Sequence, residues 1–451
     1  MRIAWATPFR RTSAIGRVSA DVTAALAARG HDVQLILTEY LEEGETLDEA
    51  SLHPTLLRWT HIKGLNLYQV AEEVDIVVAQ VGDHYGNHAG IFQLFEGRER
   101  GVNLPLLGVF HDFYLYNLFQ GWLHFSEMAK HSSRLREIEA VYGSGVREAD
   151  DPDTGLEVLA ARTPMTEWIA AKCDGALAHA QFYENRVLNA CPGPVGIARL
   201  PVTGRGIPPL APTAPGARLT ALTVGVVNPN KAAEVVIAAI AASPMLKERL
   251  EYRLTGPVEG ERRTALCALA TSLGYSGLRV EGPVDDGALA ARLEEADIII
   301  CLRKPVLEGA SGSAIEALLA GRPLLVADNG FYTELPEGIV SKVPAEFEPD
   351  ELTFALERLC TSEALRRRMG ASGRSYAQQT FLLGDYVIAL EDLLLQSLQC
   401  GPKLAFARSI GKRLSRLSIG PHDRAVPRIA QRIQTAFEFQ ETLSASLMAR
   451  Q

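Results

Sequence analysis

The stretch that decides the fold runs from residue 296 to residue 328. It reads "ADIIICL" (296–302), then "VLEGASGSAIEALLAGRP" (306–323), then "LLVAD" (324–328). Two short apolar runs flank a segment that starts with small residues and continues as a helix, so a strand, a helix and a second strand are expected. Continuous apolar runs, as opposed to alternating ones, are typical of parallel strands covered by helices on both faces.

The same rhythm fills both halves of the 451-residue chain, which is long enough for two domains. Apolar runs predict strands at 2–7, 32–37, 75–81, 104–110, 175–180, 219–227, 251–256 and 278–282. We therefore expect an α/β protein with two doubly wound, Rossmann-like domains that face a central cleft. The expected parts are a first domain (1–205) with a helical insertion at about 113–170, a Pro- and Gly-rich linker (206–218), a second domain (219–385) and a helical extension (386–451).

Composition restricts the class of protein. The net charge of −9 argues against nucleic acid as a partner, because phosphate binding usually needs a basic surface. The six cysteines form no CxxC pair, as expected of reduced thiols in a cytoplasmic protein. The N-terminus "MRIAWATPFRRTS" lacks the apolar core of a signal peptide, and no apolar run reaches the roughly 20 residues of a membrane span.

Glu308 follows a strand at its carboxyl end, where the mouth of the cleft is expected. The small residues of "GASGS" (309–313) allow a ligand to approach the backbone, and the helix that starts there favours an anion such as a phosphate. Glu316 has two interpretations. It contacts a ligand, or it closes a capping box with Ser313 at the helix N-terminus.

Glu308 and Glu316 are separated by seven residues, which resembles the Glu-x7-Glu signature of retaining glycosyltransferases of family 4, enzymes of the GT-B fold. Further segments resemble that family at 82–91, 111–119, 223–240 and 278–303. The resemblance implies metal-independent transfer of a sugar from a nucleotide-sugar donor, with retention and without a further cofactor. It also implies a glycan or lipid-linked acceptor in bacterial surface polysaccharide synthesis, such as that of lipopolysaccharide.

The resemblance also implies roles for individual residues. Glu308 and His111 would lie beside the reacting sugar, and Glu316 would accept hydrogen bonds from the ribose hydroxyls. The donor diphosphate would be bound by Lys231 and by the backbone of Gly16, Gly309, Ala310, Ser311 and Gly312. The acceptor would contact Asp112, Tyr114 and His88.

One position departs from the family pattern. Val226 stands where the family usually has an arginine that shares the diphosphate with the lysine. Arg303 supplies the second positive charge, or Asn228 replaces it by hydrogen bonding, or the site is weakened. We favour Arg303, with a solvated arginine at a strand end as the alternative. The departure keeps open a second function, that of a non-catalytic GT-B protein that binds a nucleotide or a glycan.

Three further features have two interpretations each. The aromatic residues between 113 and 125 form an acceptor platform or the core of a helix. The basic amphipathic stretch 403–419 contacts anionic lipid at the inner face of the cell membrane, or packs as a solvated helix on the first domain. The aspartate pairs at 150–151 and 285–286 are interpreted as turns or helix caps in preference to ligands of a metal, and no metal site is expected.

Overall fold

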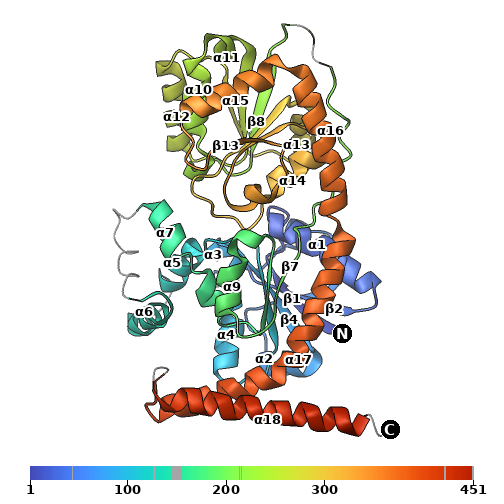
Figure 1. The fold of residues 1–451 in the computed structure, drawn as a ribbon, viewed down its shortest axis with the longest axis vertical. Helices are drawn as coiled ribbons and strands as arrows, with labels where there is room; N and C mark the ends of the chain where they lie inside the picture. The colour runs from blue at the N-terminus through green and yellow to red at the C-terminus, as the bar shows by residue number, and fades with distance from the viewer. Residues whose placement is uncertain are drawn as a thin grey trace.

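The computed structural model describes residues 1–42, 44–124, 128–143, 155–212, 214, 216–420 and 423–448. Within them, two parallel β-sheets form the centres of two domains (Figure 1). The first sheet has the strand order β3-β2-β1-β4-β5-β6-β7, and the second has β10-β9-β8-β11-β12-β13. These are the two doubly wound domains that the apolar runs predict.

The strands of the first sheet are β1 (Arg2–Thr7), β2 (Asp32–Leu37), β3 (Arg58–His61), β4 (Ile76–Val81), β5 (Leu106–Phe110), β6 (Gly175–Ala178) and β7 (Val195–Ile197). Those of the second are β8 (Leu219–Val224), β9 (Leu250–Thr255), β10 (Leu278–Gly282), β11 (Ile298–Cys301), β12 (Leu324–Ala327) and β13 (Ser341–Val343). Every residue of β4, β5 and β11 is buried, as expected of strands covered on both faces.

The helices of the first domain are α1 (Ala14–Ala28), α2 (Leu67–Glu73), α3 (Tyr85–His88), α4 (Ile91–Glu99), α5 (Tyr116–His124), α6 (Met128–Tyr142), α7 (Leu156–Arg162), α8 (Thr166–Ala170) and α9 (Glu184–Ala190), with short 3₁₀ turns at Glu49–Ser51 and Gln181–Tyr183. The insertion expected at about 113–170 holds α5 to α8. Asp150 and Asp151 lie outside the described residues.

The remaining helices are α10 (Ala233–Ala242), α11 (Pro244–Arg249), α12 (Gly260–Ser272), α13 (Asp286–Glu295), α14 (Gly312–Leu319), α15 (Pro349–Thr361), α16 (Glu363–Thr380), α17 (Leu383–Arg416) and α18 (Ala425–Met448), with 3₁₀ turns η4 (Pro229–Lys231) and η5 (Gly330–Glu334). Asp285 caps α13 by accepting a hydrogen bond from the Ala288 amide, which confirms the interpretation of that aspartate pair as a cap.

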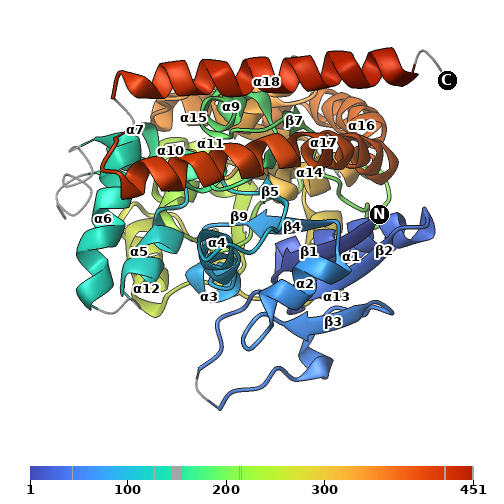
Figure 2. The same ribbon diagram turned by 90° about the horizontal axis from the view of Figure 1, so that it is seen from below.

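The C-terminal helices return to the first domain. Figure 1 shows α16 beside the second domain and α17 running down to the first, where it contacts α1, β5, β6 and β7. Figure 2 shows α18 lying alongside α17, and the rings of Phe406 and Phe437 are 5.8 Å apart. Arg408 pairs with Asp174, so this part of the stretch 403–419 packs on the first domain. Membrane contact stays a prediction. Within the described chain, no helix has both the length and the apolar character of a membrane span.

Candidate donor and acceptor cleft

The segment after β11 places an ion pair at the carboxyl edge of the second sheet. Arg303 is 3% exposed, and its Nε donates to the Glu308 carboxylate at 2.9 Å. The Tyr332 hydroxyl donates to the same carboxylate at 3.0 Å. Burial opposes the charge on Glu308, but Arg303 and Lys231 hold its pKa below the usual range. The alternative of a solvated Arg303 is wrong, because its side chain is enclosed and paired.

Lys231 lies at the end of η4 and is 6% exposed. Its Nζ donates to the carbonyl oxygen of Val224. Burial, together with the charge of Arg303, lowers the pKa of Lys231 to about 7. Gly225, at φ +93°, leaves room for the ammonium, since a Cβ there would lie 2.7 Å from Nζ.

Val226, at the position where the family usually has arginine, is 55% exposed. The Asn228 side-chain oxygen is buried and has no hydrogen-bond partner within the described residues. Asn228 therefore retains an unused hydrogen-bond acceptor close to Lys231. The positive charge that the family's arginine would supply at position 226 would have to come from Arg303. Arg303 contacts Glu308 directly, at 2.9 Å, and the charge of Lys231 also lowers the pKa of Glu308.

Helix α14 begins with a Ser311 cap, whose hydroxyl accepts from the Ala314 amide at 3.4 Å. The capping box that would join Ser313 to Glu316 is absent. Glu316 instead accepts hydrogen bonds from Arg205, with Nη2 to Oε1 at 2.9 Å. The amides of Gly312 and Ser313 lie in the first turn of α14, where a helix offers no internal acceptor. They are available to an anion in front of the helix.

A short antiparallel bridge joins the two domains at this edge. Asp112 pairs with Glu308, and the Gly309 amide donates to the His111 carbonyl oxygen at 2.8 Å. The amides of Phe113 and Tyr114 both donate to the carbonyl oxygen of Leu307 at 2.9 Å. The Gly309 amide is thus occupied by the protein, so the expected phosphate contact from Gly309 is not supported by this geometry.

His111 is held in one neutral tautomer. His179 Nδ1 must donate to Ala198 O, 3.0 Å away, so His179 Nε2 accepts from His111 Nδ1 across 3.2 Å. His111 Nε2, 2.7 Å from the Gln80 side-chain oxygen, is then an acceptor. The Gln80 amide nitrogen, which otherwise has no partner among the described residues, is the group that suits it. Burial keeps the pKa of both histidines low, to about 4 in His179.

Asp112 accepts a hydrogen bond from the Asp83 amide at 2.8 Å. Burial raises the pKa of Asp112 to about 7, and the nearby Glu308 carboxylate adds to the effect. Asp112 and Glu308 thus bring two carboxyl groups to one place, one from each domain.

A cavity of about 560 Å³ lies between the domains and in front of these groups. Helix α1, the residues after β5, the segment 200–205, α13 and the start of α14 all line it. Its lining includes the sequence-predicted residues His111, Asp112, Glu308, Ala310, Gly312 and Glu316. Lys231, Arg303, Asn228 and Ser311 are not among the lining residues. Lys231 and Arg303 lie behind Glu308.

Three predicted contacts are not supported. His88 is 1% exposed, and its Nδ1 bonds to the Gln80 carbonyl oxygen at 2.9 Å, so it belongs to the core. Burial lowers the pKa of His88 to about 4. Tyr114 is 1% exposed and packs against Tyr116 and Leu307. Gly16 gives its amide to the Ser13 hydroxyl, whereas its neighbours Ile15 and Arg17 line the cavity.

The aromatic residues of the insertion mostly form a core. Tyr114, Phe119 and Trp122 are at most 8% exposed, which favours helix packing over an acceptor platform. Phe125 lies outside the described residues.

Sequence reasoning missed the partners of Glu316. Arg205 is the last residue of the first domain, just before the linker, and Arg17 comes from α1 of the same domain, with Nη1 3.7 Å from Glu316 Oε1. Arg17 also pairs with Asp286 at 2.9 Å. Four charged side chains thus connect α1, the end of the first domain, α13 and α14. No local sequence pattern pairs residues so far apart.

No cluster of three or more potential metal ligands occurs in the part of the chain that the structure describes.

Comparisons with known proteins define the class of this fold and site. Residues 211–376 match the family of glycosyl transferases group 1, so the second domain is a domain of that kind. An MMP α-(1→4)-mannosyltransferase of Mycolicibacterium hassiacum is 33% identical over 116 residues, 25% of this chain. A D-inositol 3-phosphate glycosyltransferase of Streptomyces avermitilis is 25% identical over 311 residues, 64% of this chain. The chain spans 28% and 64% of the lengths of these relatives.

Solved structures establish the fold of most of the chain. The Anabaena protein HepE, in complex with UDP and glucose, has a TM-score of 0.59 at 14% identity, and the alignment covers 87% of this chain and 99% of that one. WaaG, a glycosyltransferase involved in lipopolysaccharide biosynthesis, has a TM-score of 0.54 at 15% identity, with the same coverage. The fold is GT-B, with two Rossmann-like domains as the sequence predicts.

Proposed function

We propose that this protein is a metal-independent, retaining glycosyltransferase that moves a sugar from a nucleotide-sugar donor to a glycan or lipid-linked glycan. The observation that carries the proposal is the meeting of Lys231, Arg303 and Glu308 beside the first turn of α14. The cavity in front of them extends to Glu316 on the same helix. The proposed setting is bacterial surface polysaccharide synthesis in the cytoplasm, with peripheral membrane contact through 403–419.

The donor leaves behind a nucleoside diphosphate, so the site must stabilise negative charge on the leaving group. Two buried cations and the free amides of α14 provide positive charge in a fixed arrangement of low polarity. In this proposal they take the place of a divalent ion. Glu308 contacts the hydroxyls of the transferred sugar, and Glu316 accepts from the ribose hydroxyls once Arg205 releases it. Asn228 offers its unused oxygen to a donor hydroxyl.

Retention follows if the acceptor attacks from the face that the diphosphate leaves. The acceptor oxygen bonds to the anomeric carbon, the bond from that carbon to the phosphate oxygen breaks, and the departing phosphate takes the acceptor proton. No protein base is needed. We assign His111 a positioning role, because both of its ring nitrogens are bonded within the protein. Asp112 is the proposed contact for the acceptor.

The test is a thermal-shift panel of UDP, GDP, ADP and CMP sugars, with UDP-glucose included because HepE was solved with UDP and glucose. One nucleotide sugar should raise the melting temperature by mass action, and Glu316→Gln should lose that shift. The shift and donor turnover should persist in a chelator, and NMR of the product should show the donor's anomeric configuration. A panel without any shift would contradict the proposal.

The second candidate is a non-catalytic nucleotide- or glycan-binding protein, favoured by Val226 in place of arginine. It predicts a nucleotide shift without hydrolysis or transfer for every donor in the panel.

A further inference from the structure

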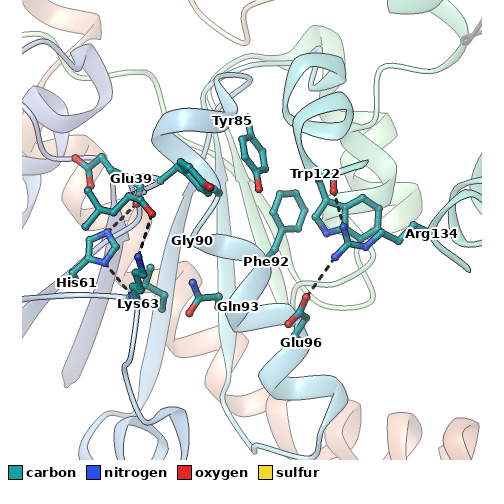
Figure 3. Close-up of a pocket in the computed structure, with 14 residues that line it drawn as sticks. Glu39, His61, Lys63, Tyr85, Gly90, Phe92, Gln93, Glu96, Trp122 and Arg134 are labelled. Atoms are coloured by element: carbon teal, nitrogen blue, oxygen red, sulfur yellow. Dashed lines mark hydrogen bonds and ion pairs between the residues drawn. The ribbon is translucent and has the colours of Figure 1, made fainter. Parts of the chain in front are cut away.

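A second cavity, of about 520 Å³, lies on the first domain (Figure 3). It forms where the chain leaves β2 and β3, against α3, α4 and α5, and Arg134 of α6 closes one end. It shares no lining residue with the cleft between the domains. Both cavities nevertheless lie at the carboxyl edge of the same parallel sheet, where such folds bind their ligands.

One wall of this cavity is a row of aromatic rings. Tyr40 and Tyr85 have ring centroids 6.0 Å apart, Tyr85 and Phe92 stack at 6.5 Å, and Phe92 and Trp122 stack at 5.3 Å. The Arg134 guanidinium covers the far face of Trp122 at 4.1 Å. Tyr40, at the open end, is 40% exposed. A flat ring at the entrance suits the apolar face of a pyranose.

The opposite wall and the floor carry polar groups. His61 and Lys63 form the opposite wall, and Gln93 lies between the two walls in Figure 3. The Gln93 side chain is exposed, on α4, and makes no hydrogen bond recorded within the described residues. Amide groups of this kind bond to adjacent sugar hydroxyls.

The cations of the cavity already have protein partners, whereas Glu39, which also lines it, has one carboxylate oxygen without a hydrogen-bond partner among the described residues. Lys63 Nζ donates to the carbonyl oxygens of Leu41 and Glu42, at 3.3 and 3.0 Å. Arg134 pairs with Glu96 at 3.7 Å. Because the cations have partners, the cavity is suited to an uncharged ligand rich in hydroxyl groups and not to a phosphate.

We propose that this cavity binds a neutral pyranose unit of the acceptor glycan, at a distance from the sugar that reacts. The inference rests on the proposed function. Helix α3 lies between the two cavities. On the side of the second cavity, the Tyr40 amide donates to the Gly86 carbonyl oxygen of α3 at 2.7 Å. Gly82, three residues before α3, adjoins Ile15, which lines the cleft. A linear glycan that crosses α3 has one unit in each cavity.

The experiment uses the full-length protein and an array of neutral mono- to tetrasaccharides of glucose, galactose and mannose. The wild type should retain a defined subset, and calorimetry should give the dissociation constant of the best one. Tyr40→Ala and Gln93→Ala should each weaken that binding about tenfold, as expected for loss of one ring face or one bidentate contact. Both side chains are exposed, so folding should be unaffected. Tyr40→Phe should retain most of the affinity.

Tyr68→Ala is the matched control, because Tyr68 is an exposed tyrosine on α2 that lies outside the cavity. It should bind the glycan like the wild type. The proposal is overturned if the wild type retains no glycan, if both cavity variants bind as the wild type does, or if nucleosides bind there in place of sugars. The nucleotide-sugar thermal shift of the wild type reports on the cleft alone, so a protein with that shift but without glycan retention would contradict only this inference.

Discussion

At the scale of single residues, Lys231 shows how the cleft prepares for an anion. Its ammonium is buried beside Arg303, and both effects favour loss of its proton, so its pKa is about 7. A diphosphate placed next to it favours the charged form again. Above pH 7 Lys231 is largely neutral in the free protein, so binding of the donor is coupled to the uptake of one proton by Lys231.

The affinity for whichever nucleotide sugar gives the thermal shift should accordingly depend on pH. It should be constant below about pH 6 and fall by up to about tenfold per pH unit above pH 7, because one proton must be bound with the donor. Calorimetry between pH 6 and 9 measures this slope. Lys231→Arg keeps its charge throughout that range and should give a flat profile. An unchanged slope in Lys231→Arg would assign the titration to another group, with Asp112 the first to examine.

Gly309 is a second residue whose identity is dictated by its neighbours. A Cβ at this position would lie 2.6 Å from the Tyr183 hydroxyl and 2.9 Å from the His111 carbonyl oxygen. The carbonyl belongs to the bridge between the domains and cannot move without breaking it. Gly309→Ala should lower the free energy of unfolding by about 1–3 kcal/mol and abolish transfer.

The matched control is Gly312→Ala, three residues on, where an added Cβ meets no atom within 4 Å. Its stability in urea denaturation should equal or exceed that of the wild type, since alanine favours the helix. If both variants were equally stable, the backbone bridge between His111 and Gly309 would tolerate an added methyl group, which would contradict this prediction.

At the scale of elements, α5 is held by a residue from another part of the chain. Asp83, just after β4, accepts from the amides of Asn117 and Leu118 at 2.8 and 3.1 Å. It therefore serves the first turn of α5 as an N-cap does. Burial, with the Asp112 charge next, raises the pKa of Asp83 to about 8.

Asp83→Ala should release both amides and destabilise α5 by about 0.5–2 kcal/mol. Hydrogen exchange should accelerate in α5 while exchange in α14, in the other domain, stays unchanged. Asp83→Asn keeps one oxygen for these amides and should exchange more slowly than the alanine variant. Uniform acceleration across both domains would contradict a local role for Asp83.

Some secondary-structure elements could be predicted from the sequence and others could not. Buried parallel strands and α14 were predictable, because their apolar runs and small residues are local signals. The edge strand β3 was not, since its residues alternate between exposed and half-buried and it has no apolar run. The burial of His88 and Tyr114, both proposed as acceptor contacts, was unpredictable for a related reason. The sequence locates the end of a strand, but packing decides which way the following side chains turn.

At the scale of the whole molecule, the site depends on contacts between distant segments. Glu308 and Glu316 were singled out because their spacing resembles a family signature, and both line the cavity between the domains. Arg17 and Arg205 both reach Glu316 from the first domain, and only the assembled fold brings them together. The same holds for α17, which returns from the second domain to the first.

The strongest of these returning contacts is centred on Asp174, which is fully buried. Its carboxylate pairs with Arg98 of α4 at 2.6 Å and with Arg408 of α17, and it accepts from the Leu106 amide at 3.0 Å. One carboxylate thus neutralises two guanidinium groups at the junction of the sheet and the C-terminal helix. Removal of its charge leaves the Arg98 guanidinium, which is 8% exposed, without a counter-ion and close to the positive charge of Arg408.

Asp174→Asn should therefore lower the free energy of unfolding by about 3–5 kcal/mol, with faster hydrogen exchange in α17. The control is Asp32→Asn, which breaks the Arg58–Asp32 pair, whose side chains are 73% and 61% exposed. That change should cost less than about 1 kcal/mol, because water screens the pair. If urea denaturation gave the same loss of unfolding free energy for the two variants, the ion pairs of Asp174 would contribute little to stability. The packing of α17 on the first domain would then depend on its apolar face.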